Sequence, residues 1–150
     1  MTGAGVTVCP ALPEDVPGIT ALDRAVVFAG HWSEHGYREL LDNRLGVLLK
    51  AELDGVLAGF LAGRIIPPEA ELDNIAVPDF LRRRGAGRAL LAEFIKQAQK
   101  AGCSAIFLEV NERNSGALEF YGRTGFRSVG RRPKFYSGID DAILMRCECE

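Results

Sequence analysis

The feature that most constrains this chain is a predicted strand-to-helix junction in the middle of the sequence. An apolar run, Leu72 to Val77, precedes the tripeptide Gly85-Ala86-Gly87, and an amphipathic helical pattern follows it. Glycines one residue apart let backbone N–H groups turn toward one point, and the next helix directs its dipole there. Four arginines flank the tripeptide: Arg82, Arg83, Arg84 and Arg88. The junction favours a phosphate or pyrophosphate site, although a tight turn with a solvated basic face fits the same residues.

Length and composition favour one globular domain over residues 1–150. A chain of 150 residues can bury a single core, and its hydrophobic content of 47% and charged content of 25% are ordinary. The net charge of −2 implies no general attraction to nucleic acid or to an anionic membrane. We expect a cytoplasmic protein, because the sequence shows neither a membrane-length apolar run nor a secretory leader pattern.

The cysteines and histidines do not predict a metal site. The four cysteines are Cys9, Cys103, Cys147 and Cys149. The first two lie in apolar contexts and are predicted to be buried, and the last two would share one face of a strand. Their spacing fits neither a disulfide framework nor a common zinc pattern. His31 and His35 are four residues apart but lack an obvious third ligand. We expect no metal cofactor.

Hydrophobic periodicity predicts a mixed order of elements. The expected strands cover residues 6–9, 46–53, 56–66, 69–77, 104–111, 126–130 and 142–147. The expected helices begin near Pro13, Ser33, Gly85 and Asn114. The first of them would bury an apolar stripe formed by Ile19, Leu22, Ala25 and Val26. Asp54-Gly55 between two apolar runs is a strong hairpin signal. Only the middle of the chain alternates strictly, so we expect a mixed α/β fold with helices on both faces of one sheet.

A Rossmann dinucleotide site is a competing interpretation of the glycine junction. The order strand, Gly-Ala-Gly, helix and strand fits it, and Glu109 lies roughly 20 residues downstream, where a ribose-binding acid is expected. Against it, Leu90 occupies the position of the third glycine, and the unit follows a hairpin without a second mononucleotide half. We therefore expect no tight binding of a nicotinamide dinucleotide.

The motif Arg82-x-x-Gly85-x-Gly87, with Asn114 and Tyr121 downstream, resembles the GNAT acetyltransferase superfamily. The predicted order of elements matches that superfamily over nearly the whole chain, and implies the GNAT acyl-CoA fold. Within it, the chain is most similar to the bacterial ribosomal-protein N-terminal alanine acetyltransferases. This similarity is carried by residues 70–77, 85–91, 107–110, 114–121 and 125–126, and by the ending over 131–136 and 140–145. The chain departs from that group at Pro78-Asp79-Phe80, and at Arg82, where Gln is usual.

The resemblance implies that acetyl-CoA is the cosubstrate. The residues that would contact it are Ile75, Ala76, Val77, Arg82, Arg83, Arg84, Gly85, Ala86, Gly87, Arg88 and Asn114. Loop amides would hold the pyrophosphate, and the strand backbone would pair with the pantetheine amides. A backbone N–H here, that of Val77, would polarise the thioester carbonyl. Asn114 would contact the pantetheine arm, while capping its helix is the ordinary role of Asn at this place.

Two side chains are candidates for proton transfer. Glu109 interrupts an otherwise apolar strand, so it should line a wet cleft or pair with a nearby arginine. In the cleft it would take the amine proton directly or through one water. The resemblance implies that Tyr121 protonates the leaving thiolate, whereas core packing is the more common role of a helical tyrosine.

The resemblance implies acetyl transfer to a primary amine by direct attack in a ternary complex. The preferred acceptor is a protein α-amine, such as the N-terminal alanine of a ribosomal protein, because its reference pKa is about 8 and that of lysine about 10.4. Lysine, a small-molecule amine, or a CoA-binding sensor without turnover remain alternatives. Candidates for a mainly acidic rim that attracts a cationic peptide terminus are Glu71, Asp73, Tyr136, Asp140 and Asp141, although a plain surface position is the ordinary role of each.

Overall fold

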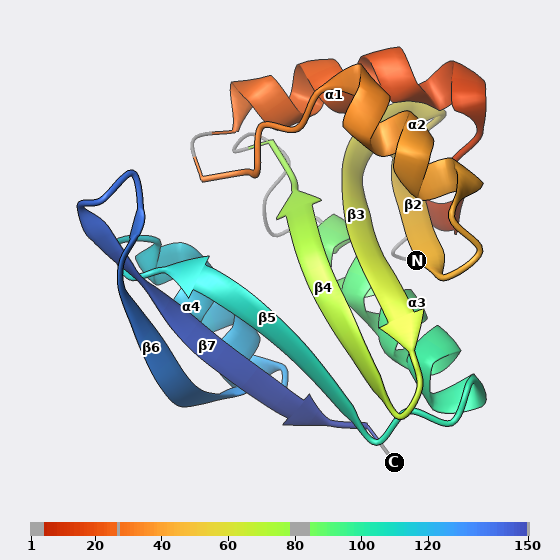
Figure 1. Cartoon of the computed structure of the whole chain (residues 1–150). Helices are drawn as coiled ribbons and strands as arrows, with labels where there is room; N and C mark the ends of the chain where they lie inside the picture. Colours follow the sequence, from red (N-terminus) through yellow and green to blue (C-terminus); the bar gives the residue numbers. More distant parts are fainter. Residues whose placement is uncertain (1–4, 27, 79–84, 150) are drawn as a thin grey trace.

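A computed structural model of the chain describes residues 5–26, 28–78 and 85–149. Within these residues one sheet has the strand order β1-β2-β3-β4-β5-β7-β6 (Figure 1). The strands are β1 (Val6–Pro10), β2 (Gly46–Leu53), β3 (Val56–Ile66), β4 (Glu69–Ala76), β5 (Ala105–Asn111), β6 (Arg127–Tyr136) and β7 (Asp140–Glu148). The helices are the 3-10 turn η1 (Pro13–Asp15), α1 (Val16–Ala25), α2 (Glu34–Asp42), α3 (Ala86–Lys100) and α4 (Ser115–Arg123).

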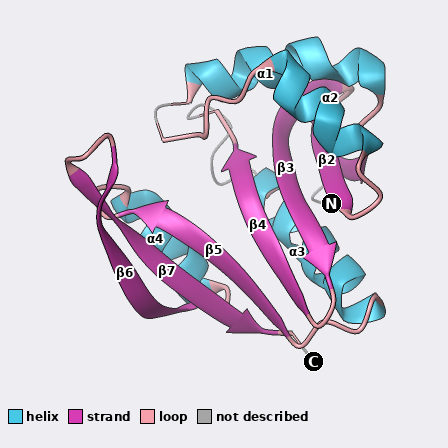
Figure 2. Cartoon of the chain, in the orientation of Figure 1, coloured by secondary structure: helices cyan, strands magenta, loops and turns pink. Residues whose placement is uncertain are grey.

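The predicted mixed fold is confirmed. β4 and β5 are parallel, and the other neighbouring strands of the described sheet are antiparallel. Helices α1 and α2 cover one face over β2 and β3, while α3 and α4 lie behind the sheet (Figure 2). None of the helices in the described part is long and apolar enough to cross a membrane.

Local signals in the sequence set several element boundaries. The Ser33 hydroxyl accepts a hydrogen bond from the Gly36 N–H at 3.1 Å and caps α2. Asn114 caps α4 by accepting from the Ala117 N–H at 3.1 Å. Asp54-Gly55 forms the expected turn between β2 and β3. The predicted cap and hairpin signals are therefore confirmed.

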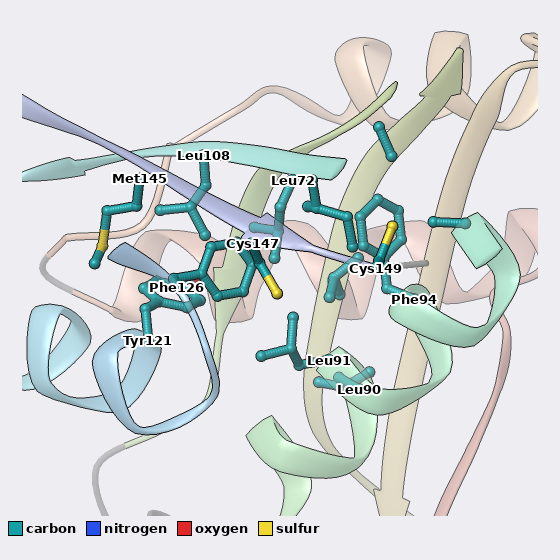
Figure 3. Close-up of a cluster of buried hydrophobic side chains, with 14 of the residues drawn as sticks. Leu72, Leu90, Leu91, Phe94, Leu108, Tyr121, Phe126, Met145, Cys147 and Cys149 are labelled. Atoms are coloured by element: carbon teal, nitrogen blue, oxygen red, sulfur yellow. The ribbon is translucent and has the colours of Figure 1, made fainter. Parts of the chain in front are cut away.

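Two cores hold the helices to the sheet. The larger core lies between the sheet and α3 and α4, and includes Leu72, Leu90, Phe94, Leu108 and Tyr121 (Figure 3). The smaller core packs α1 and α2 on the opposite face of β2, β3 and β4. Because side chains alternate along a strand, each sheet residue belongs to one face or the other. This alternation determines which side of the sheet each candidate residue faces.

Three predicted details are wrong. β6 extends to Tyr136 rather than Gly130, because this edge strand is mostly exposed and lacks the apolar alternation that would have shown it. Ala25 was expected on the buried face of α1 but is exposed, since that face instead carries Val16, Ile19, Thr20 and Asp23. Cys9 is only partly buried, because β1 is the other edge of the sheet.

Candidate active site

β4 and β5 pair over only the first part of their lengths. Their parallel register runs from Glu69 opposite Ala105 to Leu72 opposite Leu108. Beyond that point β4 pairs only with β3, and β5 only with β7, within the described sheet. The two strands therefore diverge, as Figure 1 shows. We call the region beyond Leu72 and Leu108, where the two strands no longer pair, the opening. The divergence leaves backbone N–H and C=O groups of β4 available to an extended ligand.

A bulge in β4 lies where the strands part. Leu72 is opposite Gly63 and Asn74 is opposite Ala62, so Asp73 is an extra residue in the ladder. A bulge bends its strand and increases the local twist. The bend accounts for the turn of β4 away from β5. Ile75 and Ala76, which were predicted to contact the coenzyme, lie in the unpaired stretch that follows.

The start of α3 is open to an anion. Gly85 is the N-cap residue with φ +90°, and no side chain in the described part caps the helix. The Gly85 carbonyl accepts the first helical hydrogen bond from the Ala89 N–H at 2.9 Å. The N–H groups of Ala86, Gly87 and Arg88 precede that bond and lack a helical acceptor. Such N–H groups, together with the helix dipole, favour an anion such as a phosphate group.

This helix start lies against the end of β4 and against α4. A Cβ atom built on Gly87 would be 3.8 Å from Val77 Cγ2 and 3.7 Å from the Phe120 ring. The structure thus brings together the start of α3, the end of β4 and helix α4. Each of these contains or adjoins a residue predicted to contact acetyl-CoA. Arg82, Arg83 and Arg84 were predicted at the same site and lie outside the described residues.

We expect Gly85→Ala to weaken CoA binding by about fivefold. A non-glycine residue at this φ costs about 1 kcal/mol, which the free protein avoids by leaving this conformation and the CoA-bound protein does not. Space is not the cause, since no atom of the described residues beyond its chain neighbours lies within 4 Å of the added methyl group. Gly138→Ala is a matched control with φ +69° and equally open surroundings, in the turn between β6 and β7. Titration calorimetry with CoA should separate the two variants. Equal CoA affinities of the two variants would contradict a phosphate site at the start of α3.

Glu109 lies beside the opening on the face opposite α4. Its neighbours Leu108 and Val110 point into the core with α4, so alternation directs Glu109 the other way. Its Oε2 forms an ion pair with Arg132, whose Nε lies 2.7 Å away, and its side chain is 32% exposed. Burial, followed by the charge of Glu109, raises the pKa of Tyr136, so this tyrosine is a neighbour. Both expectations for Glu109, the arginine partner and the solvent-accessible position, are found together.

Tyr121 lies on the other face of the sheet, in the core that α4 forms with it. Its ring is buried between Phe120 and Phe126, with ring centroids 5.3 and 5.4 Å away (Figure 3). Burial raises the pKa of its phenol well above the usual value, so the hydroxyl keeps its proton at neutral pH. That hydroxyl forms no hydrogen bond to another residue in the described part of the chain.

The predicted acidic rim divides into two ion-pair clusters. On β4, Glu71 and Asp73 both pair with Arg64, at 3.2 and 3.0 Å. On β7, the Arg131 guanidinium and the Lys134 N–H hold Asp141 and lower the pKa of its carboxyl group. The five residues therefore do not form one continuous ring. The physical reason is that each acid has its own cationic neighbour: Arg64 for the two on β4, Arg131 for Asp141, and Arg113, at 3.8 Å, for Asp140.

A buried polar network was missed by the sequence analysis. The carboxylate of Asp23 is fully buried and accepts hydrogen bonds from the His31 and Trp32 N–H groups, each at 2.7 Å. It also accepts from the Tyr37 hydroxyl at 2.5 Å. Asn74 on β4 donates to that hydroxyl at 2.8 Å, and accepts from the N–H of Gly30, in the same loop, at 2.9 Å. The network fastens the loop between α1 and α2 to the diverging part of β4. An acid four residues after Ile19, on a buried helix face, was the available signal.

A hollow of about 450 Å³ lies beside this loop. It is lined by Trp32, Gly36, Glu39, Leu40, Asn43, Arg64 and Asp73. Asp73 and Arg64 are the bulge residue and its ion-pair partner, so the hollow lies next to the diverging strand. It provides a mixed polar and aromatic wall on the face of β4 that carries α1 and α2.

The histidines do not assemble a metal site. His31 lies before α2, with Nε2 2.9 Å from the Val26 carbonyl oxygen, and His35 on α2 is 3.5 Å from Glu39. Among the described residues, no group of three His, Cys, Asp or Glu side chains is arranged to hold a metal ion.

The comparisons with known proteins agree with this geometry. The acetyltransferase (GNAT) family model matches residues 19–126. The [ribosomal protein bS18]-alanine N-acetyltransferase of Escherichia coli K12 is 37% identical over 95 residues, which are 61% of this chain and 64% of that protein. The match therefore spans less than two thirds of that curated relative.

Solved structures extend the similarity over the whole fold. The ribosomal-protein-S18-alanine N-acetyltransferase from Escherichia coli has a TM-score of 0.85 at 28% identity, and the match covers 97% of this chain and 94% of that one. The PaiA N-acetyltransferase from Thermoplasma acidophilum, solved in complex with coenzyme A, has a TM-score of 0.80 at 21% identity. That match covers 95% of this chain and 98% of the other, and shows the fold alone.

Proposed function

Because this chain belongs to the GNAT acetyltransferase family, we propose that it transfers acetyl from acetyl-CoA to the α-amine of a protein N-terminus. The observation that carries the proposal is the divergence of β4 and β5 beyond Leu72, beside the open N-terminus of α3. Such an opening suits a long ligand with phosphates at one end and amides along its arm. The N-terminal alanine of a ribosomal protein is the finer proposal, supported by the name of the Escherichia coli relative.

In this proposal Glu109 and Tyr121 each transfer one proton. The neutral amine attacks the thioester carbonyl carbon, a C–N bond forms, and a β4 backbone N–H stabilises the developing oxyanion. Glu109 takes the amine proton, directly or through a water molecule. The C–S bond then breaks, its electron pair stays on sulfur, and Tyr121 supplies the proton that completes the CoA thiol. Positioning both reactants in one opening contributes several kcal/mol to the rate.

We expect Tyr121→Phe to lower kcat by about 100-fold, a typical loss for a positioned proton donor. The phenyl ring keeps the packing against Phe120 and Phe126, so thermal stability and CoA affinity should change little. Stopped-time assays of CoA thiol release, with calorimetric CoA titration as the companion measurement, check this. A variant with unchanged kcat would show that Tyr121 serves the core alone.

The proposed function is tested by incubating the protein with acetyl-CoA and two sets of peptides. One set has free Ala or Ser N-termini and no lysine, and the other has blocked N-termini and internal lysine. We expect CoA release with the first set. Release only with the second set would favour a lysine acetyltransferase, and CoA binding without release from either would favour a sensor.

A further inference from the structure

The carboxylate that we propose as the base already has a cationic partner. Arg132 Nε and Glu109 Oε2 form an ion pair at 2.7 Å. The Arg132 guanidinium carbon is also 5.5 Å from the Phe135 ring centroid, so an aromatic face supports it. Phe135 in turn packs edge-on against Tyr136, with centroids 5.0 Å apart. The end of the β6–β7 hairpin therefore holds one guanidinium at Glu109.

The neighbouring arginine of this hairpin is engaged elsewhere. Arg131 pairs with Glu112 at 3.2 Å and with Asp141 at 2.5 Å. The two arginines are adjacent in sequence and so project to opposite faces of β6. Glu109 therefore pairs with Arg132 and not with Arg131. The opposite orientation of the two side chains explains why adjacent arginines have different partners.

We propose that Arg132 determines specificity by disfavouring acceptors that arrive as ammonium ions; this proposal rests on the proposed function. An ammonium ion that approaches the Glu109–Arg132 pair meets no net negative charge to offset the loss of its hydration. A neutral amine does not incur that loss. At pH 7 about one tenth of an α-amine is neutral, against less than about one thousandth of a lysine side chain. Arg132 therefore selects α-amines over lysine.

The test compares Arg132→Gln with Arg131→Gln, a control that removes a neighbouring positive charge from the same strand. Arg132 is 57% exposed, so the substitution leaves the core intact. Two peptides of one sequence are used, one with a free α-amine and no lysine, the other N-acetylated with one internal lysine. Calorimetry gives the Kd of each for the CoA-loaded protein, and CoA release gives kcat/KM.

We expect Arg132→Gln to bind the lysine peptide about two- to fivefold more tightly, the range for a partly exposed ion pair. The ratio of kcat/KM for lysine over α-amine should rise by the same factor, with Arg131→Gln resembling the unaltered protein. Unchanged lysine affinity in Arg132→Gln, or an equal change in Arg131→Gln, would overturn the proposal. If the unaltered protein acetylates neither peptide, the proposed function fails, and the Kd comparison alone decides the role of Arg132.

Discussion

Glu109→Gln should reduce kcat by about 100-fold or more while leaving CoA affinity unchanged. Glutamine has nearly the same shape as glutamate but cannot accept the proton that the amine must lose. Glu109 faces away from the core that contains Tyr121, so the substitution should not disturb the proposed coenzyme side of the opening. Single-turnover acetylation with saturating acetyl-CoA and a free-N-terminus peptide measures the loss in the chemical step.

Glu119→Gln is the matched control for this prediction. Glu119 is 66% exposed on α4 and pairs with Arg123, away from the opening. We expect it to retain full activity. If Glu109→Gln also keeps most of its activity, the carboxylate serves only its ion pair with Arg132, and the amine loses its proton to solvent.

Asp23→Ala is expected to destabilise the protein by about 3 kcal/mol, because three hydrogen-bond donors lose one buried acceptor at a cost of about 1 kcal/mol or more each. For a chain of this size the loss corresponds to a fall in Tm of about 6–12 °C. The donors are the Tyr37 hydroxyl and the N–H groups of His31 and Trp32. Urea unfolding followed by circular dichroism measures the change in the free energy of unfolding.

Thr20→Val is the control for the buried network. Thr20 is also buried in α1, but its hydroxyl donates only to the Val16 carbonyl at 2.8 Å, within the same helix. We expect a loss of about 1 kcal/mol or less. Equal losses in the two variants would mean that Asp23 does no more than a local helix hydrogen bond. Hydrogen exchange at Gly30 and Trp32 should accelerate only in Asp23→Ala.

Local chemistry made much of the fold predictable from the sequence. The caps at Ser33 and Asn114 and the turn at Asp54-Gly55 depend on neighbours within a few residues, so short windows of sequence contain the signal. The mixed character of the sheet followed from the order of the elements. The bulge at Asp73 did not, because a ladder register depends on two strands and on the packing of both their faces.

The candidate site shows the same division. The glycine junction and the family resemblance brought Gly87 and Val77 together, and the structure has them in proximity. The sequence left open whether Glu109 pairs with an arginine, and gave no means of selecting Arg132. The pairing of Glu109 with Arg132 depends on strand β7, which lies between β5 and β6. On this strand Leu144 is opposite both Glu109 and Gly130. Alternation then puts Glu109 and Arg132 on the same face of the sheet.

The most direct test of the central claim uses one peptide with a free N-terminal alanine and a single internal lysine. The protein is incubated with acetyl-CoA and this peptide, and tandem mass spectrometry locates the added acetyl group. The account predicts acetyl on the alanine α-amine, with the lysine unmodified. Acetyl on the lysine alone, or an unmodified peptide despite measurable CoA binding, would contradict it.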